Sequence, residues 1–438
     1  MKLGFSELLM ILLIALILLG PRLLPRLETA WQRTQVREAR RERRLERQKE
    51  ELRRRRELFF RRLRRAIAIA LGAAAAAWLL YLCFGPLPYE PQKYAKLAAA
   101  DTVAAEADHT ADTQISLAPY SDPICVAEQE GWLYAAVDGG KVVRIRPDGT
   151  GLAEVLSTGG AVTALAFGPD GALYLTDAAA AGTLSGGGAL YRASFDGWAV
   201  SLETILTSVD GRRLQCPAGL AVGSDGTLYF TDFGAVPAAE YGLFGALSTE
   251  LAVHDTQGKL YAYDPESRKT ECVAEGMCGA AGVALSTDEK RVYVAEAGAC
   301  RVWAVDAAAR GIDLSASAPD AVLVLDALPG YPAGLAVSSD GTLRTALCGS
   351  RIGWLDHAAG QPLLRRMVLH LPRLSQRGLL LPKAEKGRIL ACSGNGGIVR
   401  VDIDTAFGSG RLTGVCAVQN GCWLANADGD SLYFAAGA

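Results

Sequence analysis

The first 85 residues alternate between apolar and charged stretches. Residues 8–19 are all Leu, Ile, Met or Ala, and residues 66–84 form a 19-residue apolar run without a charge. The second run has the length of a transmembrane helix, and the first makes a short span together with its flanking residues. We therefore predict membrane helices over residues 1–21 and 66–85. A signal peptide is the alternative interpretation of the first.

The segment between the two apolar runs is strongly basic. Residues 22–65 contain 17 arginines and one lysine against seven glutamates, a net charge of +11. No Gly or Pro follows Pro25 in this segment, which predicts one charged helix about 66 Å long. Because positive residues favour the cytoplasmic side, the block predicts an external N-terminus and an extracytoplasmic main domain at the cell membrane. The arginines either contact anionic lipid or act as a topology signal on a solvated helix.

The remainder of the chain, from about residue 120 to 438, repeats one pattern. Each copy is an apolar strand, a turn of the Asp-Gly or Asn-Gly type, and a second strand, which is a strong hairpin signal. Two copies, beginning at Pro217 and Pro332, read Pro-Ala-Gly-Leu-Ala-Val-x-Ser-Asp-Gly-Thr-Leu. The six copies start near residues 124, 162, 217, 281, 332 and 414. Hairpins that recur at this spacing must stack to bury both faces, so we predict an all-β six-bladed propeller preceded by α-helical membrane segments.

Three segments do not follow the repeat. Residues 86–119 show no clear period and are interpreted as a linker, with a short helix around residues 94–107. Residues 233–257 form an insertion inside the third blade. Residues 361–375 predict a short, basic, amphipathic helix that caps the propeller, docks on the membrane or binds a partner.

Charge and motifs narrow the function classes. The net charge is −2, so the residues outside the basic block are acidic overall, and we predict no nucleic-acid partner. The sequence has no phosphate-binding loop and no G-x-S-x-G elbow, which gives no support to an NTPase or a serine hydrolase. Its four histidines form no ligand spacing. We therefore assign no cofactor from the sequence.

The ten cysteines do not form a recognisable framework. Cys83 lies at the end of the second apolar run, which leaves nine in the main domain, and no C-x-x-C pair is present. A structural zinc site is therefore not expected. Two pairs, Cys272 with Cys278 and Cys416 with Cys422, are spaced six apart and remain candidates for disulfides.

The N-terminus resembles a known membrane protein family. The residues that carry the resemblance are Phe5-Ser6-Glu7-Leu8-Leu9, Gly20-Pro21 and Leu24-Pro25, followed by a charged helix. Over about 35 residues they resemble the small subunit of the twin-arginine translocase. The chain departs from that pattern because its charged helix lacks a broad apolar face and is followed by a second apolar run and a large domain. The resemblance implies a borrowed anchor or, alternatively, a role in protein translocation.

The repeats resemble the strictosidine synthase-like proteins and, more distantly, the senescence-marker-protein/gluconolactonase family. The strings that carry this resemblance are Leu228-Tyr-Phe-Thr-Asp232, Gly258-Lys-Leu-Tyr-Ala-Tyr-Asp-Pro265, Val292-Tyr-Val-Ala-Glu296 and Leu328-Pro-Gly-Tyr-Pro332. The resemblance covers about residues 120–438. It implies a six-bladed propeller with a central pocket.

The resemblance also implies a set of metal ligands that this chain has lost. The lactonase and esterase members hold a divalent ion on the axis through a Glu in the first blade and Asn or Asp at the start of later inner strands. Oxygen ligands of this kind suit Ca²⁺. The corresponding positions in this chain are Ile124, Ala218, Ala281 and Ala333. We therefore predict no metal at the axis and no metal-dependent hydrolysis.

Three acidic residues remain as candidates for a polar site. Asp177, Asp232 and Glu296 end the second strands of three blades, and antiparallel pairing places them beside the starts of the first strands. They either form a negative pocket at the propeller mouth, for a cation, an amine or acid–base chemistry, or bind the adjoining turns.

Three functions follow from these observations. The first is a membrane-anchored binding or scaffold module that takes an unidentified small molecule or protein at the propeller mouth. The second is an enzyme, either a lactonase- or esterase-like hydrolase or a strictosidine synthase-like condensing enzyme, whose catalytic residues are unassigned. The third is a translocation-related role carried by the N-terminal segment.

Overall fold

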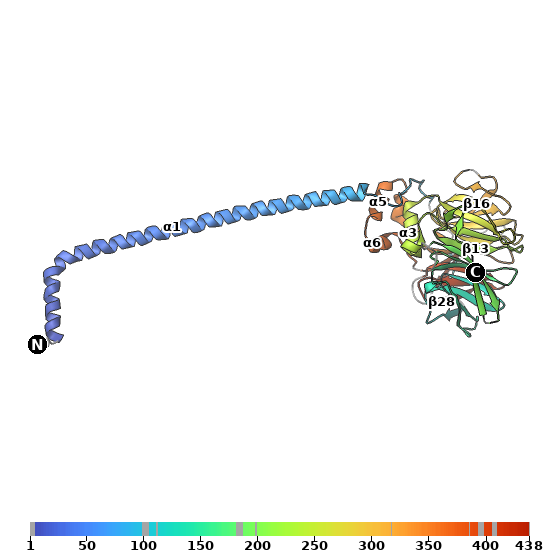
Figure 1. Cartoon of the computed structure of the whole chain (residues 1–438), viewed down its shortest axis with the longest axis horizontal. Helices are drawn as coiled ribbons and strands as arrows, with labels where there is room; N and C mark the ends of the chain where they lie inside the picture. Colours follow the sequence, from blue (N-terminus) through green and yellow to red (C-terminus); the bar gives the residue numbers. More distant parts are fainter. Residues whose placement is uncertain are drawn as a thin grey trace. The chain divides into compact units, whose positions relative to one another are not determined.

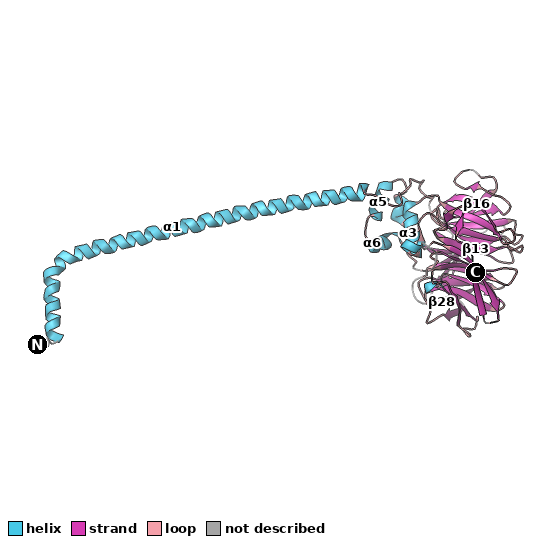
Figure 2. Ribbon diagram, viewed as in Figure 1, coloured by secondary structure: helices cyan, strands magenta, loops and turns pink. Residues whose placement is uncertain are grey.

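The structure is a computed structural model, which describes residues 5–98, 105–110, 113–180, 187–197, 199–316, 318–384, 386–392, 398–404 and 410–437. The chain divides into two compact units, Met1–Tyr81 and Leu82–Ala438. The first unit is helical and the second contains the strands (Figures 1 and 2).

The first unit lies within one long helix, α1 (Phe5–Phe84), which contains both predicted apolar runs and the charged segment. Within the described part of the chain, the segment Glu28–Phe84 holds a stretch long and apolar enough to cross a membrane, with a mean hydropathy of 2.2. Its side chains are exposed, including Ile69 at 73% and Leu71 at 66%. Apolar surface of this extent is stable in lipid rather than in water, so α1 indicates membrane association. The arrangement with two spans stays a prediction.

The second unit is built around six sheets, one for each predicted repeat, whose strands are antiparallel except where β1 and β20 add in parallel at the edges of two of them. Blade 1 contains β3 (Cys125–Gln129), β4 (Trp132–Val137), β5 (Lys141–Ile145) and β6 (Ala153–Ser157), with the 3-10 helix η1 (Asp138–Gly140) before β5. Blade 2 contains β7 (Val162–Phe167), β8 (Leu173–Asp177), β9 (Ala189–Asp196) and β10 (Ala199–Leu206). Blade 3 contains β13 (Pro217–Val222), β14 (Leu228–Asp232), β15 (Gly258–Asp264) and β16 (Lys269–Met277), with β20 (Ile312–Asp313) at its edge.

The other three blades follow the same order. Blade 4 contains β17 (Ala280–Leu285), β18 (Arg291–Glu296), β19 (Arg301–Asp306) and β21 (Ala321–Leu325). Blade 5 contains β22 (Gly330–Val337), β23 (Leu343–Ser350), β24 (Gly387–Cys392) and β25 (Ile398–Asp404), with β1 (Ala105–Thr110) parallel to β25. Blade 6 contains β26 (Leu412–Val418), β27 (Gly421–Asn426), β28 (Ser431–Ala436) and β2 (Thr113–Ser116). A small hairpin, β11 (Ser208–Val209) with β12 (Arg212–Arg213), precedes blade 3.

The first strand of each blade begins within two residues of its predicted start. This agreement confirms the six-bladed propeller. It arises because the turn between the first two strands of each blade fixes the register of that hairpin. The turn is Asp-Gly or Asn-Gly in blades 2, 3, 5 and 6, Glu130-Gly131 in blade 1 and Asp288-Glu289 in blade 4. The apolar strands on either side of the turn bury their side chains between neighbouring blades.

The predicted linker, residues 86–119, differs from the structure at both ends. The described residues 86–98 contain no helix, and β1 begins at Ala105, so neither end of the short helix predicted around residues 94–107 is helical; its middle, residues 99–104, lies outside the described residues. At the other end, β2 pairs with β28 and completes blade 6. Ile115 and Leu117 are buried, at 4% and 0% exposed. The propeller therefore begins before residue 120, because its last three strands need a fourth to cover their open edge.

Five short helices lie within or beside the two insertions. They are α2 (Ala238–Tyr241), α3 (Leu243–Val253), α4 (Gly353–His357), α5 (Pro362–Leu369) and α6 (Arg373–Leu380). The single helix predicted over residues 361–375 is split at Pro372, which has no amide hydrogen to continue α5 and caps the start of α6 instead. Helices α3, α5 and α6, here called the helical cap, gather beside one another against the propeller (Figure 2). Ala252, Val253, Leu369 and Leu380 form their shared core.

Candidate functional site

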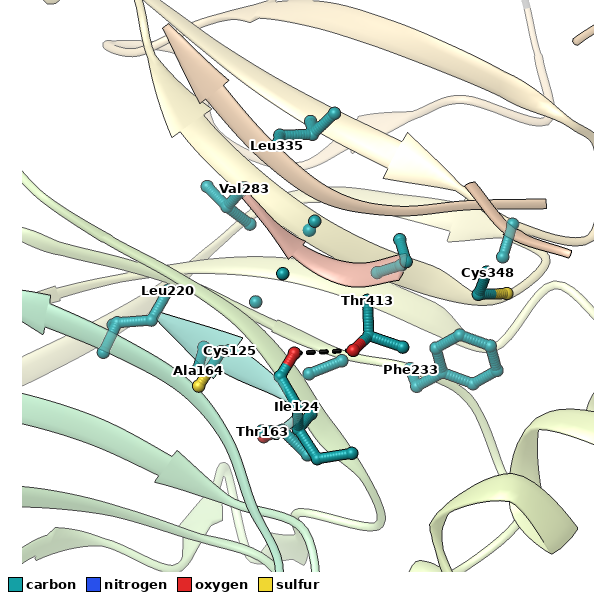
Figure 3. A pocket seen from close by; sticks show the side chains of 18 of the residues that line it. Ile124, Cys125, Thr163, Ala164, Leu220, Phe233, Val283, Leu335, Cys348 and Thr413 are labelled. Carbon is teal, nitrogen blue, oxygen red and sulfur yellow. Dashed lines mark hydrogen bonds between the residues drawn. The ribbon is translucent and has the colours of Figure 1, made fainter. Parts of the chain in front are cut away.

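The inner strands of all six blades surround a small cavity, here called the axial pocket, of about 140 Å³. The four positions where the family resemblance places metal ligands, Ile124, Ala218, Ala281 and Ala333, all line it. Phe233, in the loop after β14, and three residues of α3 (Leu243, Phe244 and Leu247) complete its wall. The structure therefore brings these four sequence positions together, in apolar surroundings (Figure 3).

Glycines directly after Ala218, Ala281, Ala333 and Thr413 bring four pairs of neighbouring inner strands close together. Gly219, Gly282, Gly334 and Gly414 each lie so near the backbone of the next blade that an added Cβ would come within 3.0 Å of it. The four contacts run from blade 3 through blades 4, 5 and 6 to blade 1. Only a residue without a side chain permits this approach, so the inner strands pack backbone against backbone around the axis.

Threonine hydroxyls link the same strands by hydrogen bonds between blades. Thr163 Oγ1 donates to the carbonyl of Pro217 at 2.7 Å, and Thr413 Oγ1 donates to the carbonyl of Ile124 at 2.7 Å (Figure 3). Thr163 and Thr413 occupy the repeat position that is alanine in blades 3, 4 and 5. Sequence analysis did not single them out, although aligning the six copies on their Asp-Gly or Asn-Gly turns would have placed both beside the axis.

The ionisable side chains among the lining residues of the axial pocket are three thiols. They belong to Cys125, Cys216 and Cys348, which are 8%, 2% and 3% exposed. Burial raises the pKa of Cys125 to about 12 and that of Cys348 to about 11, and raises the pKa of Cys216 further. These thiols therefore stay protonated near neutral pH and are weak nucleophiles. Cys272, Cys278, Cys416 and Cys422 all keep unpaired thiols, so neither candidate disulfide is formed.

The donor set of the axial pocket does not fit a hard cation. Ca²⁺ takes six to eight oxygen ligands and favours carboxylates. The four predicted ligand positions offer alkyl side chains, and the hydroxyls of Thr163 and Thr413 already donate to carbonyl groups. Among the described residues, no group of three or more His, Cys, Asp or Glu is arranged to hold a metal.

The three candidate acids lie at equivalent places in their blades. Asp177 pairs with Val162, Asp232 with Pro217 and Glu296 with Ala280, so each is beside the start of an inner strand. They are 0%, 8% and 2% exposed. None of them is among the residues that line the axial pocket.

Each of these acids accepts hydrogen bonds from a neighbouring loop. Asp177 Oδ1 accepts from the amides of Ala161 and Ala179, both at 2.8 Å. Asp232 accepts from the amides of Gln215 at 3.1 Å and Cys216 at 2.7 Å. These bonds hold the chain next to the start of each inner strand. Asp177 and Asp232 therefore bind the adjoining turns, which is the second of the two roles considered above. Burial raises the pKa of Asp232 to about 6, while the two amides oppose that rise.

Glu296 lies at a second cavity, of about 510 Å³, rather than at the axis. Its carboxylate accepts from Arg301 Nε at 2.6 Å and from Trp303 Nε1 at 2.8 Å. The ring of His254, in the same cavity wall, stacks on Tyr94 with 3.4 Å between ring centroids, and burial lowers its pKa to about 3. The three acids therefore do not converge on one site.

Comparisons with known proteins agree with the sequence resemblance. Residues 201–363 match the model of the SMP-30/Gluconolactonase/LRE-like region, and residues 1–42 match that of the mttA/Hcf106 family. The protein STRICTOSIDINE SYNTHASE-LIKE 6 of Arabidopsis thaliana is 24% identical over 65% of this chain and 68% of its own length. The adipocyte plasma membrane-associated protein of Salmo salar is 25% identical over 57% of this chain and 60% of its own length.

Solved structures share the fold. A gluconolactonase from Xanthomonas campestris superposes with a TM-score of 0.50 at 17% identity, over 78% of this chain and 100% of its own. A luciferin-regenerating enzyme superposes with a TM-score of 0.50 at 15% identity, over 74% of this chain and 95% of its own. At these identities the likeness concerns the fold alone. The chain therefore has strictosidine synthase-like homologues, a propeller that includes the gluconolactonase-like region, and an N-terminus that matches the mttA/Hcf106 family.

Proposed function

We propose that this protein is a membrane-anchored propeller that acts as a ligand- or protein-binding scaffold rather than as a metal-dependent hydrolase. The observation that carries the proposal is the composition of the axial pocket. Where an ion would need oxygen ligands, the chain presents Ile124, Ala218, Ala281 and Ala333. A pocket of this kind favours an apolar group over an ion, since transfer of an ion from water into apolar surroundings is costly.

An enzyme without a metal is the second candidate, and Asp232 is the residue that favours it. A carboxyl group with a pKa of about 6 suits general acid–base chemistry near neutral pH. Two observations weigh against this role: the carboxylate accepts from two backbone amides, and it lies outside the lining of the axial pocket. A role in translocation rests on residues 1–42 alone.

The first test is a hydrolase assay of the full chain in detergent, with lactones and aryl esters, in the presence and absence of Ca²⁺. We expect no Ca²⁺-dependent turnover and no rise in the melting temperature on adding Ca²⁺, because the pocket offers the ion too few oxygen ligands. A gluconolactonase assayed alongside is the positive control. Ca²⁺-dependent turnover would contradict the proposal, and Ca²⁺-independent turnover that is lost in Asp232→Asn would favour the second candidate.

We further propose that the propeller is extracytoplasmic and that two spans hold it, with the Arg-rich segment in the cytoplasm. The net charge of +11 over residues 22–65 supports this orientation. Buried thiols with raised pKa values are compatible with an oxidising compartment, since the thiolate is the reactive form.

Labelling of lysines with a membrane-impermeant amine reagent tests this topology. In right-side-out vesicles we expect Lys290, whose side chain is 82% exposed, to be modified, while Lys49 in the charged segment is protected. Inside-out vesicles should give the reverse pattern and serve as the control. If two spans are present, Lys2 is on the same side of the membrane as Lys290 and is modified with it. If only one span is present, Lys2 is on the same side as Lys49 and is protected with it. Modification of Lys49 together with Lys290 in intact vesicles would overturn the orientation.

A further inference from the structure

We propose that helices α5 and α6 dock on the anionic lipid surface beside the point where α1 leaves the membrane. This inference rests on the proposed membrane anchor and assigns a partner, the lipid headgroup layer, to a surface of the propeller. Three observations carry it: the attachment of α5 to the chain that follows α1, the exposed leucines of α5 and α6, and the charge of this segment.

The chain immediately after α1 is bound by α5. We call residues 85–98 the strap. Arg366 donates hydrogen bonds to the carbonyl of Gly85 and to the carboxylate of Glu90. Gly85 follows directly on Phe84, the last residue of α1 and of its second apolar run. Helix α5 is therefore bonded to the residue that directly follows that run, and for a transmembrane helix this residue belongs to the headgroup region.

Arg365 fixes the next part of the strap to the helical cap. It is fully buried and donates to the carbonyls of Ala252 at 2.8 Å and of Gln92. The amide of Gln92 in turn donates to the carbonyl of Val253 at 2.7 Å. These bonds join the strap, α3 and α5, so the cap stays attached to the residues that follow α1 while they hold.

The outer surface of α5 and α6 is unusually apolar for a soluble domain. Leu363 and Leu364 on α5 are 47% and 43% exposed, and Leu374 and Leu379 on α6 are 84% and 42% exposed. Four exposed leucines on two adjoining short helices, beside the end of a membrane helix, match the way amphipathic helices insert apolar side chains at a lipid interface.

The basic charge of residues 360–383, which include α5 and α6, favours a membrane with anionic lipid. Residues 360–383 contain five Lys or Arg and no Asp or Glu. Arg365 is buried and Arg366 pairs with Glu90, so Arg373, Arg377 and Lys383 supply the exposed charge of the segment. Arg373 and Arg377 lie on α6 at exposed positions, one helical turn apart. Arg373 also donates to the carbonyl of Glu240 at 3.0 Å and lies over the ring of Tyr241, and both of these partner groups are uncharged. Basic side chains near an anionic leaflet are attracted to it, and attachment to the anchor makes that encounter intramolecular.

Hydrogen–deuterium exchange of the full chain in lipid nanodiscs tests this docking. Discs of neutral phosphatidylcholine are compared with discs that also contain anionic phosphatidylglycerol, and with detergent micelles. We expect the α6 amides, residues 373–380, to exchange about tenfold more slowly in anionic discs, because lipid contact stabilises the helix. The double variant Leu374→Gln with Arg377→Gln should lose this protection.

Val322→Gln is the matched control, since Val322 is 50% exposed on β21, outside the cap. It should keep the slow exchange of α6, and the exchange of the propeller strands reports whether each variant is folded. Equal α6 exchange in anionic discs, neutral discs and micelles would overturn the docking. Slow exchange that requires two copies per disc would assign the surface to a second copy and overturn it as well. Failure of the chain to enter discs would instead count against the membrane anchor.

Discussion

Replacing Gly282 with alanine is expected to destabilise the propeller by about 3 kcal/mol or more, the upper end of the range for overpacked cores. A Cβ at this position would collide with the carbonyl oxygen of Ala333 and lie 2.8 Å from the amide nitrogen of Leu335. Both atoms belong to the backbone of the next blade, so no side-chain rotation relieves the contact. The inner strands of blades 4 and 5 would have to separate at the axis.

The free energy of unfolding, measured in detergent by chemical denaturation with tryptophan fluorescence as the signal, checks this expectation. Gly360→Ala is the matched control, because a Cβ on Gly360 meets no atom within 4 Å and its backbone is outside the left-handed region. This control should change the stability by less than about 1 kcal/mol. If Gly282→Ala were as stable as the control, the backbone-to-backbone packing of blades 4 and 5 would be wrong.

The second large effect is expected for Arg365→Met. Arg365 is fully buried, and its guanidinium donates to the carbonyls of Ala252, Val253, Ala359 and Gln92. It also lies over the ring of Tyr94, with 4.8 Å between the guanidinium carbon and the ring centroid. Methionine fills much of the space but donates no hydrogen bond. Several buried carbonyls lose a donor, which we expect to cost about 3 kcal/mol and to free the strap.

Digestion with a lysine-specific protease measures whether the strap is freed. Lys93 and Lys96 are exposed on it, and cleavage after either separates α1 from the propeller. The variant should be cut about tenfold faster than the parent, because cleavage needs local opening of the bound segment. Arg291→Met, at an exposed position at the start of β18, should be cut at the parent's rate. An unchanged rate in Arg365→Met would mean that other contacts hold the strap.

The features of the fold that could be read from the sequence are the local ones. An Asp-Gly or Asn-Gly turn lies between two apolar strands in four blades, and Glu130-Gly131 and Asp288-Glu289 take that place in blades 1 and 4, so the six inner strands could be placed without a structure. The strand β2 escaped prediction because it is four residues long and pairs with β28, more than 300 positions later. Its buried Ile115 and Leu117 do alternate with polar residues, but so short a pattern does not distinguish a strand from a linker.

The candidate site was predictable where it depended on strand position, and not where it depended on loops. Strand position placed Ala218, Ala281 and Ala333 around one pocket, and it placed Asp232 beside Pro217. The partners of Asp232 are backbone amides of the preceding loop. Every residue except proline has such an amide, so residue types in the sequence do not predict which amides bind Asp232. The Ala-Gly pairs in the repeats did contain the signal for close packing, since a glycine inside a strand often marks another backbone nearby.

The order in which the chain meets the propeller has a mechanical consequence. The strand β2, which completes blade 6 by pairing with β28, is also one of the first strands after the membrane helix. Without a further attachment, tension on α1 would act directly on the hydrogen bonds between β2 and β28. Arg365 and Arg366 of α5 donate hydrogen bonds to the carbonyls of Gln92 and Gly85, which precede that strand in the chain. A force that pulls on α1 therefore acts first on α5 and on its packing against α3. The pairing of β2 with β28 bears this force only after the hydrogen bonds of Arg365 and Arg366 to the strap have broken.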